Sequence, residues 1–326
     1  MSLTAFPNGI TSFGMPVSPG FGMSTGNVYY ICQTTNTVPY ADMVLKFGGQ
    51  TYENDGSSIL HTTIQSGLDA CVADRDDYVL INLDSSDYDI TAALTMSLKG
   101  VHLICPAGLG ANGMGMNAAR VNIASALASI TLTADCVEMA GIFFKSFLNS
   151  THIINLSGSR WHANIHDNFI GGAWSSAGSA CIGIGNATGP MQQCSIHHNY
   201  ITNYSPSAMT GTDNAVSAFI TLGPESSTRN LIADNILQTG ANTTVATGIK
   251  AIGHGDMVLR NYLFETYALN AVQTGIFTLG ISAGVAVFCS DNKFGMATPA
   301  NALSGGTADQ SYCDNWEATS GATVVT

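Results

Sequence analysis

The sequence predicts an all-β solenoid, and three observations support this prediction. Charged residues make up only 10% of the 326 residues and glycine contributes 35, a mixture with many β-formers and turn formers that is typical of short strands. A short motif recurs along the C-terminal half of the chain. The segments between its copies hold short apolar runs that end near Gly or Asn, and they leave no room for a helix of about ten residues. Helical solenoids and alternating β/α sheets are therefore disfavoured.

The recurring motif is a hydrophobic residue, two variable residues, an asparagine, one variable residue and a second hydrophobic residue. It occurs in NIHDNFI, CSIHHNYI, NLIADNIL, MVLRNYLF and FCSDNKF, at spacings of 26 to 36 residues. We interpret each copy as one coil of a parallel β-helix, with the asparagine at the turn between two strands. There it is expected to adopt a left-handed conformation and to bond to the asparagine of the next coil. The predicted asparagine ladder consists of Asn168, Asn199, Asn235, Asn261 and Asn292.

The hydrophobic positions of the motif are expected to point inward and to stack from coil to coil. One column is Ile165, Ile196, Ile232, Val258 and Cys289, and the other is Ile170, Ile201, Leu237, Leu263 and Phe294. Earlier coils are expected in DYVLINL, ALTMSLKGVHLICPAG and ASITLTADCVEMAGIFF. The last of these has Gly141 where the asparagine would be.

A short helix is expected at the N-terminal end of the coils, within residues 57–77. Ile64, Leu68, Cys71 and Val72 are spaced as on one helix face. A helix at this place would cap the open end of the stack, an edge that could otherwise pair with another strand. Residues 56–326 are thus predicted to form the capping helix and the β-helix.

Residues 1–55 are predicted to form an extended N-terminal arm. The first 30 residues carry no charge and are rich in Gly, Pro, Phe and Met. Such a segment is too small to build a core of its own and too apolar to be a solvated tail. We expect it to pack against another subunit, with Phe6, Phe13, Met15 and Phe21 as attachment residues.

The composition also argues against several classes of partner. The formal net charge is −12 and no cluster of cations is present, so nucleic acid is not expected as a ligand. No apolar run is long enough for a membrane span, and no basic residue precedes Lys46 as a signal peptide would require. The eight cysteines form no CxxC pair, which favours buried free thiols in a protein made in a reducing cytoplasm.

Residues 57–316 resemble the pectate-lyase-like superfamily of right-handed β-helices, whose usual entry looks like TIQSGLDACVADRDDYVLINLDSSDYDITAALTMSLKGVHLICPAG. The segment FPNGITSFGMPV resembles the N-terminal segments of tailed-phage virion proteins that carry such domains. The resemblance implies a virion protein, assembled in the host cytoplasm as a homotrimer, whose partners are other capsid or tail proteins. A capsid decoration protein is favoured over a tailspike, which usually has a larger head-binding domain and a C-terminal trimerisation domain.

Two histidines occupy equivalent positions in successive coils and raise the question of a metal. His166 and His197 each lie two residues before the repeat asparagine, and Asp167 and His198 follow them. Two imidazoles and a carboxylate suit zinc or iron. The column continues as Ala233 and Leu259, however, so a solvent-facing or interface pair is favoured and no cofactor is expected.

A comparison with polygalacturonases gives a weak catalytic alternative. That family hydrolyses pectin with carboxylates from successive coils and a histidine in Gly-His-Gly, and Asp213, Asp234 and His254 match in part. Asp234 is followed by Asn235 rather than by the paired aspartate, and the Arg-x-Lys motif is missing. Glycoside hydrolysis needs a pair of carboxyl groups. With these three residues as its candidate group, the alternative function is a tailspike or receptor-binding protein that binds or cleaves host surface polysaccharide.

Aromatic residues follow several of the repeat asparagines and should point outward. Phe169, Tyr200 and Tyr262 form this column, and Trp161 and Trp174 could extend it. An outward aromatic column suits either a glycan platform or an interface with a neighbouring subunit. An exposed apolar stripe of this length favours the interface.

Overall fold

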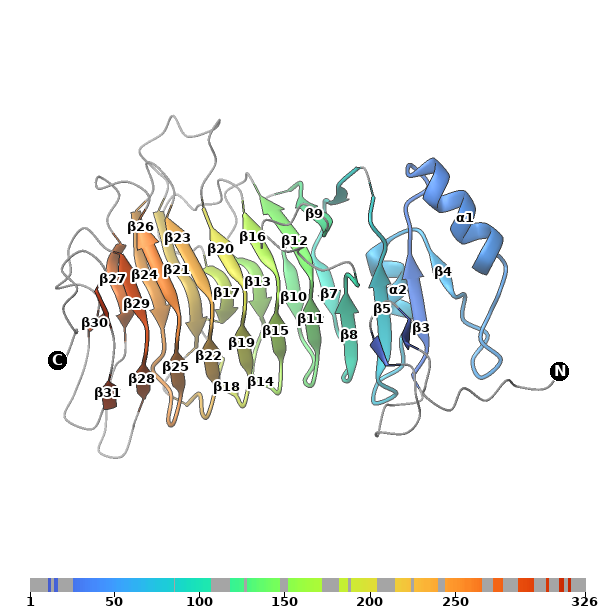
Figure 1. Cartoon of the computed structure of the whole chain (residues 1–326). Coiled ribbons are helices and arrows are strands. Elements are labelled where there is room, and N and C mark those ends of the chain that lie inside the picture. Colours follow the sequence, from blue (N-terminus) through green and yellow to red (C-terminus); the bar gives the residue numbers. More distant parts are fainter. Residues whose placement is uncertain are drawn as a thin grey trace.

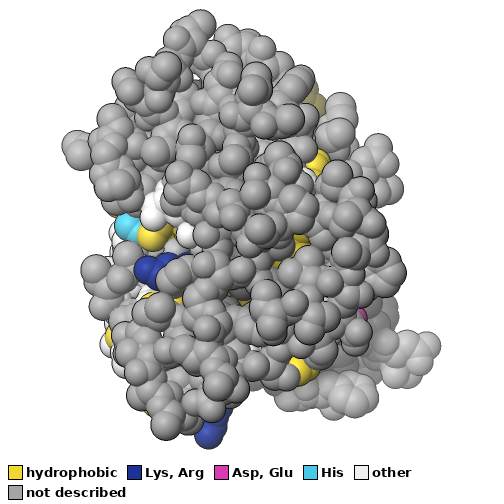
Figure 2. Space-filling view, turned by 90° about the vertical axis from the view of Figure 1, so that its left-hand side faces the viewer, with side chains coloured by type: hydrophobic (Ala, Val, Ile, Leu, Met, Phe, Trp, Pro, Cys, Tyr) yellow, Lys and Arg dark blue, Asp and Glu magenta, His cyan; other side chains and the backbone are white. Residues whose placement is uncertain are grey.

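The protein is a right-handed parallel β-helix, as predicted (Figure 1). The computed structural model describes residues 11–12, 15–16, 26–84, 86–106, 118–125, 128–146, 152–171, 182–186, 189–203, 215–223, 226–239, 244–265, 272–277, 287–295, 303–304, 311–313 and 316–317. The coils succeed one another along one axis, from the N-terminal helices to the C-terminal end (Figure 1). Figure 2 looks onto the C-terminal end of the stack.

Three parallel sheets run along the axis, and from β6 (Tyr88–Ile90) onward the chain contributes one strand to each sheet in turn. The eight-stranded sheet contains β7 (Leu94–Met96), β10 (Ile130–Leu132), β13 (His152–Leu156), β17 (Ile182–Asn186), β21 (Ala215–Leu222), β24 (Thr244–Lys250), β27 (Val272–Phe277) and β30 (Leu303–Ser304). The eleven-stranded sheet contains β4 (Leu60–His61), β3 (Val28–Ile31), β5 (Asp77–Ile81), β8 (Val101–Ile104), β11 (Glu138–Ala140), β15 (Asn164–His166), β19 (Ser195–His197), β22 (Leu231–Ala233), β25 (Met257–Leu259), β28 (Phe288–Ser290) and β31 (Ser311–Cys313). The nine-stranded sheet contains β6 (Tyr88–Ile90), β9 (Ala119–Ile123), β12 (Ile142–Ser146), β16 (Phe169–Gly171), β20 (Tyr200–Thr202), β23 (Ile236–Thr239), β26 (Tyr262–Glu265), β29 (Lys293–Gly295) and β32 (Trp316–Glu317).

Both predicted inward columns are confirmed by the strand register. Ile165 pairs with Ile196, and the pairing continues through Ile232 and Val258 to Cys289. The second column is in register from Ile170 to Phe294 in the same way. Every member of both columns is at most 2% exposed, so the coil interior is a continuous apolar core. This burial is the main source of stability of the stack.

The asparagine ladder is also confirmed, but its backbone geometry differs from the prediction. Asn199 Oδ1 accepts hydrogen bonds from the backbone N and Nδ2 of Asn168, at 3.2 and 3.1 Å, and the pattern repeats to Asn292. The left-handed residue is the one before each asparagine, as at His198 with φ 54°. The side chain of that residue points outward, and the side chain of the asparagine that follows it is buried in the turn. The prediction that the asparagine itself is left-handed was therefore wrong.

Gly141 has the same conformation, with φ 73°, and aligns with Asp167 rather than with Asn168. Ile142 occupies the asparagine position of that coil, and its backbone N donates to Asn168 Oδ1 at 3.1 Å. The predicted alignment of Gly141 was wrong by one residue.

A second polar ladder, not predicted, lies at the turn that enters the eleven-stranded sheet. Cys194 N donates to Asn230 Oδ1 at 2.9 Å, and Asn230 N and Nδ2 both donate to Asp256 Oδ1 at 2.9 Å. Asn230 and Asp256 are fully buried. Earlier coils carry Ala163 and Cys194 at this position, so the sequence shows no recurring residue there. A two-strand pair, β14 (Arg160–Trp161) and β18 (Met191–Gln192), lies beside this turn.

The N-terminal end of the stack contains more structure than the predicted arm. Helix α2 (Ile64–Ala70) lies within the predicted capping segment and buries Ile64 and Leu68 against the first coil. Helix α1 (Thr37–Phe47) and strand β3 fall inside residues 1–55, which were expected to be extended throughout. In β3 the inward Tyr29 and Ile31 are fully buried, so this segment already belongs to the coil.

Of the first 25 residues, only the backbone of a short hairpin is described. It consists of β1 (Thr11–Ser12) and β2 (Met15–Pro16), which pair antiparallel. The side chains of Phe6, Phe13, Met15 and Phe21 lie outside the described residues. Their predicted role in attachment stays a prediction.

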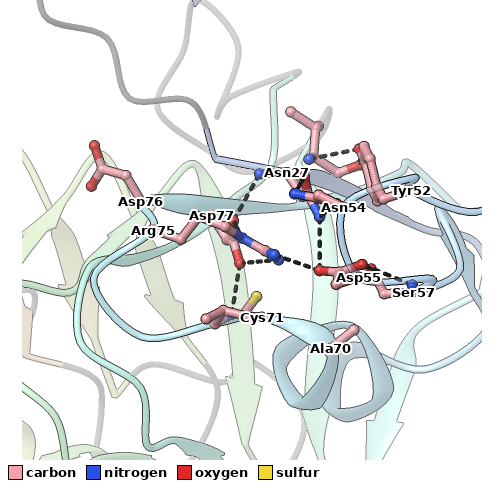
Figure 3. Close-up of polar contacts among 12 residues, drawn as sticks. Asn27, Tyr52, Asn54, Asp55, Ser57, Ala70, Cys71, Arg75, Asp76 and Asp77 are labelled. Carbon is pink, nitrogen blue, oxygen red and sulfur yellow. Dashed lines mark hydrogen bonds and ion pairs between the residues drawn. The ribbon is translucent and has the colours of Figure 1, made fainter.

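A polar clamp fixes the chain where it enters the first coil (Figure 3). The buried Asp77 carboxylate accepts hydrogen bonds from Asn27 N and Val72 N, each at 2.7 Å, and from Arg75. Arg75 also forms an ion pair with Asp55. The Tyr52 hydroxyl accepts a bond from the backbone N of Val28 at 2.8 Å. These bonds begin at residue 27 and hold the start of β3 against the first coil.

The six cysteines whose side chains are described are free, and five of them are buried. Neither α1 nor α2, the helices of the described chain, is long and apolar enough to span a bilayer.

Candidate functional site

Polar side chains gather on the outer face of the eleven-stranded sheet. We call this group the histidine tract, and it consists of Asp76, His102, Glu138, His166, Asp167, His197 and His198. Strands β8, β11, β15 and β19 lie side by side in the sheet, so outward residues of successive coils meet. His102 pairs in register with Glu138, and His166 pairs with His197.

Carboxylates and imidazoles alternate through the first half of the tract. His102 Nε2 lies 3.0 Å from Asp76 Oδ1, and its Nδ1 lies 2.6 Å from Glu138 Oε2. His166 Nε2 lies 2.8 Å from Glu138 Oε1, and its Nδ1 lies 2.7 Å from Asp167 Oδ2. An ionised carboxylate only accepts hydrogen bonds, so an imidazole between two of them must carry a proton on each nitrogen. Glu138 thus bridges two imidazolium ions.

The pKa directions agree with this assignment. Burial lowers the pKa of His102 and of His166, but the hydrogen bonds with Glu138 and with the second carboxylate outweigh it, so both pKa values are raised. Hydrogen bonds from His102 and then His166 lower the pKa of Glu138 to about 2, against the opposing effect of burial. Glu138 is therefore ionised at neutral pH, and its charge favours the protonated form of both imidazoles.

His197 differs from its stacked neighbour. Its ring lies parallel to that of His166, with centroids 4.9 Å apart and an interplanar angle of 3°. Its Nε2 lies 3.1 Å from Asn164 Oδ1 and its Nδ1 lies 2.8 Å from His198 Nδ1. Burial, followed by the charges of His166 and His198, lowers the pKa of His197. The pKa values of the two stacked rings are thus shifted in opposite directions.

The structure brings His166 and His197 together as predicted, but it does not offer a metal site there. Both nitrogens of His166 already contact carboxylates, so neither has a free lone pair for a metal ion. Across the described part of the chain, no group of three or more His, Cys, Asp or Glu side chains could hold a metal. The tract links coils to one another through charge-assisted hydrogen bonds.

The catalytic alternative is not assembled by the described residues. Asp213 lies outside them. Asp234 follows β22, where it forms a two-point ion pair with Arg260 at 2.8 and 2.7 Å that lowers its pKa. His254 is exposed in the turn that precedes β25, whereas Arg260 follows that strand. Asp234 and His254 therefore lie at opposite ends of two neighbouring strands, β22 and β25, in different turns.

The outward aromatic column exists, and its geometry is informative. We call it the aromatic stripe, and it consists of Phe143, Phe169, Tyr200, Ile236 and Tyr262, in register on the nine-stranded sheet. The rings of Phe169 and Tyr200 stack face to face, 5.0 Å apart at 11°. Phe143 packs its ring edge-to-face with Phe169, 4.7 Å apart at 78°. Because these ring faces cover one another, they are not free to stack on sugars, whereas Tyr262 is 39% exposed.

The two predicted tryptophans do not extend the stripe in the described structure. Trp161 is exposed in β14, beside the turn that precedes the eleven-stranded sheet. Trp174 lies outside the described residues. Trp161 and the stripe therefore do not share a surface, because all residues of the stripe belong to the nine-stranded sheet.

An apolar pocket at the N-terminal end was missed by sequence reasoning. We call it the N-terminal pocket; it has a volume of about 470 Å³ and is lined by Tyr30, Met43, Leu80, Ile81, Asn82, Leu83 and Pro106. The signal for it was the unbroken run YVLI in β5, because a strand with one solvent face should alternate. Outward Leu80 is instead buried, in a small apolar cluster with Ile104 and Ala140 outside the coil.

Comparisons with known proteins find similar folds. No family model matches the chain, and no curated protein matches it either. A solved structure described as a rhamnogalacturonan lyase is 10% identical, with a TM-score of 0.46, and the match covers 92% of this chain and 90% of that one. The crystal structure of the pectate lyase Pel9A is 14% identical, with a TM-score of 0.41, and the match covers 93% of this chain and 83% of that one. At these identities the similarity is one of fold.

Proposed function

We propose that the protein is a structural component of a tailed-phage virion, most specifically a capsid decoration protein, attached through its N-terminal end. The observation that carries the proposal is helix α1, none of whose residues is fully buried. Its inner face is half-buried, with Phe47 stacked on Tyr30. Val38 is 71% and Leu45 is 85% exposed on this helix. The uncharged segment 1–25 precedes it in the sequence.

An isolated helix of 11 residues is marginal in water, and most helices in proteins are stabilised by packing. An exposed apolar helix beside an open apolar pocket is the kind of surface that another protein covers. The polar clamp around Asp77 supports the same role, because it fastens the entry of the chain to the stack. A pulling force on the N-terminal segment would be transmitted to the sheets through the hydrogen bond from Asn27 N to Asp77.

The test is binding of the purified protein to capsids assembled without it. The truncation should end at residue 25, since Asn27 and Val28 belong to the clamp. We expect loss of binding by the truncated chain and by the double variant V38E/L45E. The control is M257E, at an exposed apolar residue of β25 away from α1. Full binding by both the truncated chain and the double variant would reject attachment through the N-terminal end.

The homotrimer is part of the proposal and uses a different surface. The aromatic stripe exposes Ile236 and Tyr262 on the flank of the stack. In a trimer the stripe of one copy would be buried against a neighbouring copy. The rings of Phe169 and Tyr200 stack face to face, so their edges are the parts left for apolar contact with that copy. We expect a trimer by light scattering, and I236K should yield monomers with an unchanged circular dichroism spectrum. A monomeric wild-type protein would remove this part of the proposal.

A receptor-binding spike remains the second candidate function. It is supported by the exposed rings of Tyr262 and Trp161, which could each take one sugar. The test is calorimetric titration with host surface polysaccharide, with release of reducing ends measured in parallel. Binding that is lost in W161A or Y262A would favour this candidate, and absence of heat with the wild-type protein would reject it.

A further inference from the structure

Three imidazoles meet at the C-terminal end of the histidine tract. His166 ends β15, His197 ends β19, and His198 follows β19 in the turn. The rings of His166 and His197 are stacked 4.9 Å apart, and the ring of His198 stands edge-on to that of His197, at 5.0 Å and 86°. The protonation of one ring therefore affects the other two.

The contacts of His197 fix the position of its hydrogen. Its Nε2 lies 3.1 Å from Asn164 Oδ1, which only accepts hydrogen bonds, so Nε2 carries the hydrogen. In the neutral ring Nδ1 is then an acceptor. The Nδ1 of His198 lies 2.8 Å from it and donates the hydrogen between them. This N–H···N bond can exist only while Nδ1 of His197 is unprotonated.

We propose that His197 and His198 form an acid-operated switch, in which a proton on Nδ1 of His197 breaks their bond and His198 turns to Asp167. The proton comes from solvent. Once it is bound, two N–H groups face each other, so one ring has to move. His198 is exposed whereas His197 is half-buried against His166, so His198 is the ring that moves. The switch does not depend on the proposed function.

Asp167 is the acceptor that His198 can reach. Asp167, His198 and Asp234 occupy the same left-handed position in three successive coils, with φ values of 53°, 54° and 56°. Neighbouring coils are about 4.8 Å apart. Arg260 binds both carboxylate oxygens of Asp234, at 2.8 and 2.7 Å. Among the described residues, Asp167 binds only His166, through Oδ2, so its Oδ1 is left to accept a hydrogen bond from His198.

The groups around His197 set the pH at which the switch operates. Burial, and then the charges of His166 and His198, lower the pKa of His197, whereas Asp167 and Asp234 oppose this effect. The proton is therefore bound below the ordinary histidine pKa of about 6.5. The titratable and charged groups that face His197 are His166 and Asp167 from β15 and its turn, His198 from its own turn, and Asp234 with Arg260 from the turns after β22 and β25.

The acid state lengthens the alternating part of the tract. His166 already lies between the carboxylates of Glu138 and Asp167. With His198 on the free oxygen of Asp167, that carboxylate bridges two imidazoles, as Glu138 does. Acid thus changes the charge and the hydrogen-bond donors on the outer face of the eleven-stranded sheet.

Crystal structures at pH 8 and at pH 4.5 test the switch directly. We expect His198 Nδ1 to lie within hydrogen-bond distance of His197 at pH 8. At pH 4.5 we expect a ring nitrogen of His198 to lie within hydrogen-bond distance of Asp167. An unmoved His198 at pH 4.5, or separate His197 and His198 rings at pH 8, would overturn the proposal.

Nitrogen-15 NMR of the histidine rings follows the same step in solution. A scalar coupling between the two Nδ1 atoms should be present at pH 8 and disappear as His197 titrates. D167N removes the charge that receives His198, so His197 should take up its proton about one pH unit lower than in wild type. H198N removes the donor to Nδ1, so His197 should take up its proton at a higher pH. Both variants should fold, because asparagine tolerates the left-handed backbone.

H162Q is the matched control, because His162 is an exposed left-handed histidine outside the tract. We expect this substitution to leave the titration of His197 unchanged. A titration of His197 that is the same in wild type, D167N and H198N would overturn the proposal. A shift of equal size in H162Q would do the same.

Discussion

Replacing Glu138 with glutamine removes the carboxylate that bridges His102 and His166. The substitution keeps the size of the side chain and one oxygen acceptor. It also turns the second oxygen into an NH₂ group, which faces the N–H of an imidazole. Both imidazoles lose their shared counter-charge, so both should release a proton more easily.

The size of the effect follows from the pKa of Glu138, which falls from an ordinary value of 4.5 to about 2. One pKa unit corresponds to about 1.4 kcal/mol, so the full shift corresponds to roughly 3 kcal/mol. The side chain is 23% exposed, and solvent screening reduces this value. We expect E138Q to lower the free energy of unfolding by about 1–2 kcal/mol at pH 7.

The sign of the pH dependence is fixed by the direction of the shift. A carboxyl group whose pKa is lowered on folding stabilises the protein above its unfolded pKa, and this contribution is lost as the pH falls through the folded pKa. The difference between wild type and E138Q should therefore shrink towards pH 2, as Glu138 takes up a proton. It should also shrink at high pH, as His102 and His166 lose theirs, because a group whose pKa is raised on folding loses its stabilising contribution when the pH rises through the folded pKa.

Urea unfolding at a series of pH values measures this difference, with E53Q as the control at an exposed acid outside the tract. Histidine NMR titration adds a direct readout, because the pKa values of His102 and His166 should both fall in E138Q. Unchanged imidazole pKa values, or an equal loss of stability in E53Q, would refute the reasoning.

Two further predictions concern the polar ladders. N199A removes the acceptor of two hydrogen bonds from Asn168 and leaves a buried backbone N–H unpaired, which should cost about 1–3 kcal/mol and lower the urea midpoint, whereas S195A on the same coil should change it little. Burial raises the pKa of Asp256, so its charge destabilises the fold increasingly as the pH rises through the folded pKa. D256N removes this charge but replaces the oxygen that accepts from Gly253 N at 3.0 Å with an NH₂ group, so the measurable prediction is the pH dependence. The melting temperature of D256N relative to wild type should fall from pH 8 to pH 3, and a difference that does not change with pH would contradict the assignment.

The regular part of the fold was predictable because one residue marks each coil. Asn199 is required by a buried turn, and Ile196 and Ile201 stand at fixed offsets from it. Register, inward columns and ladder follow from that single marker. The conformation of the turn did not follow, because an asparagine tolerates the left-handed region as readily as His198 beside it.

The parts that were missed have no repeated marker. Gly141 satisfies the left-handed position without an asparagine beside it, so the coil that holds Glu138 was misaligned by one residue. The link from Glu138 to His102 and His166 depends on that register and could not be seen. Strand β3 and helix α1 occur once each, and their apolar residues were interpreted as part of an arm.

The most direct measurement of the central claim is an electron cryomicroscopy reconstruction of capsids decorated with the full chain. We predict that the N-terminal end lies against the particle, with Val38 and Leu45 of α1 buried in the contact and the coil axis pointing away from the shell. A reconstruction in which α1 is exposed to solvent, or in which the C-terminal end or a flank of the stack contacts the particle, would contradict attachment through the N-terminal end.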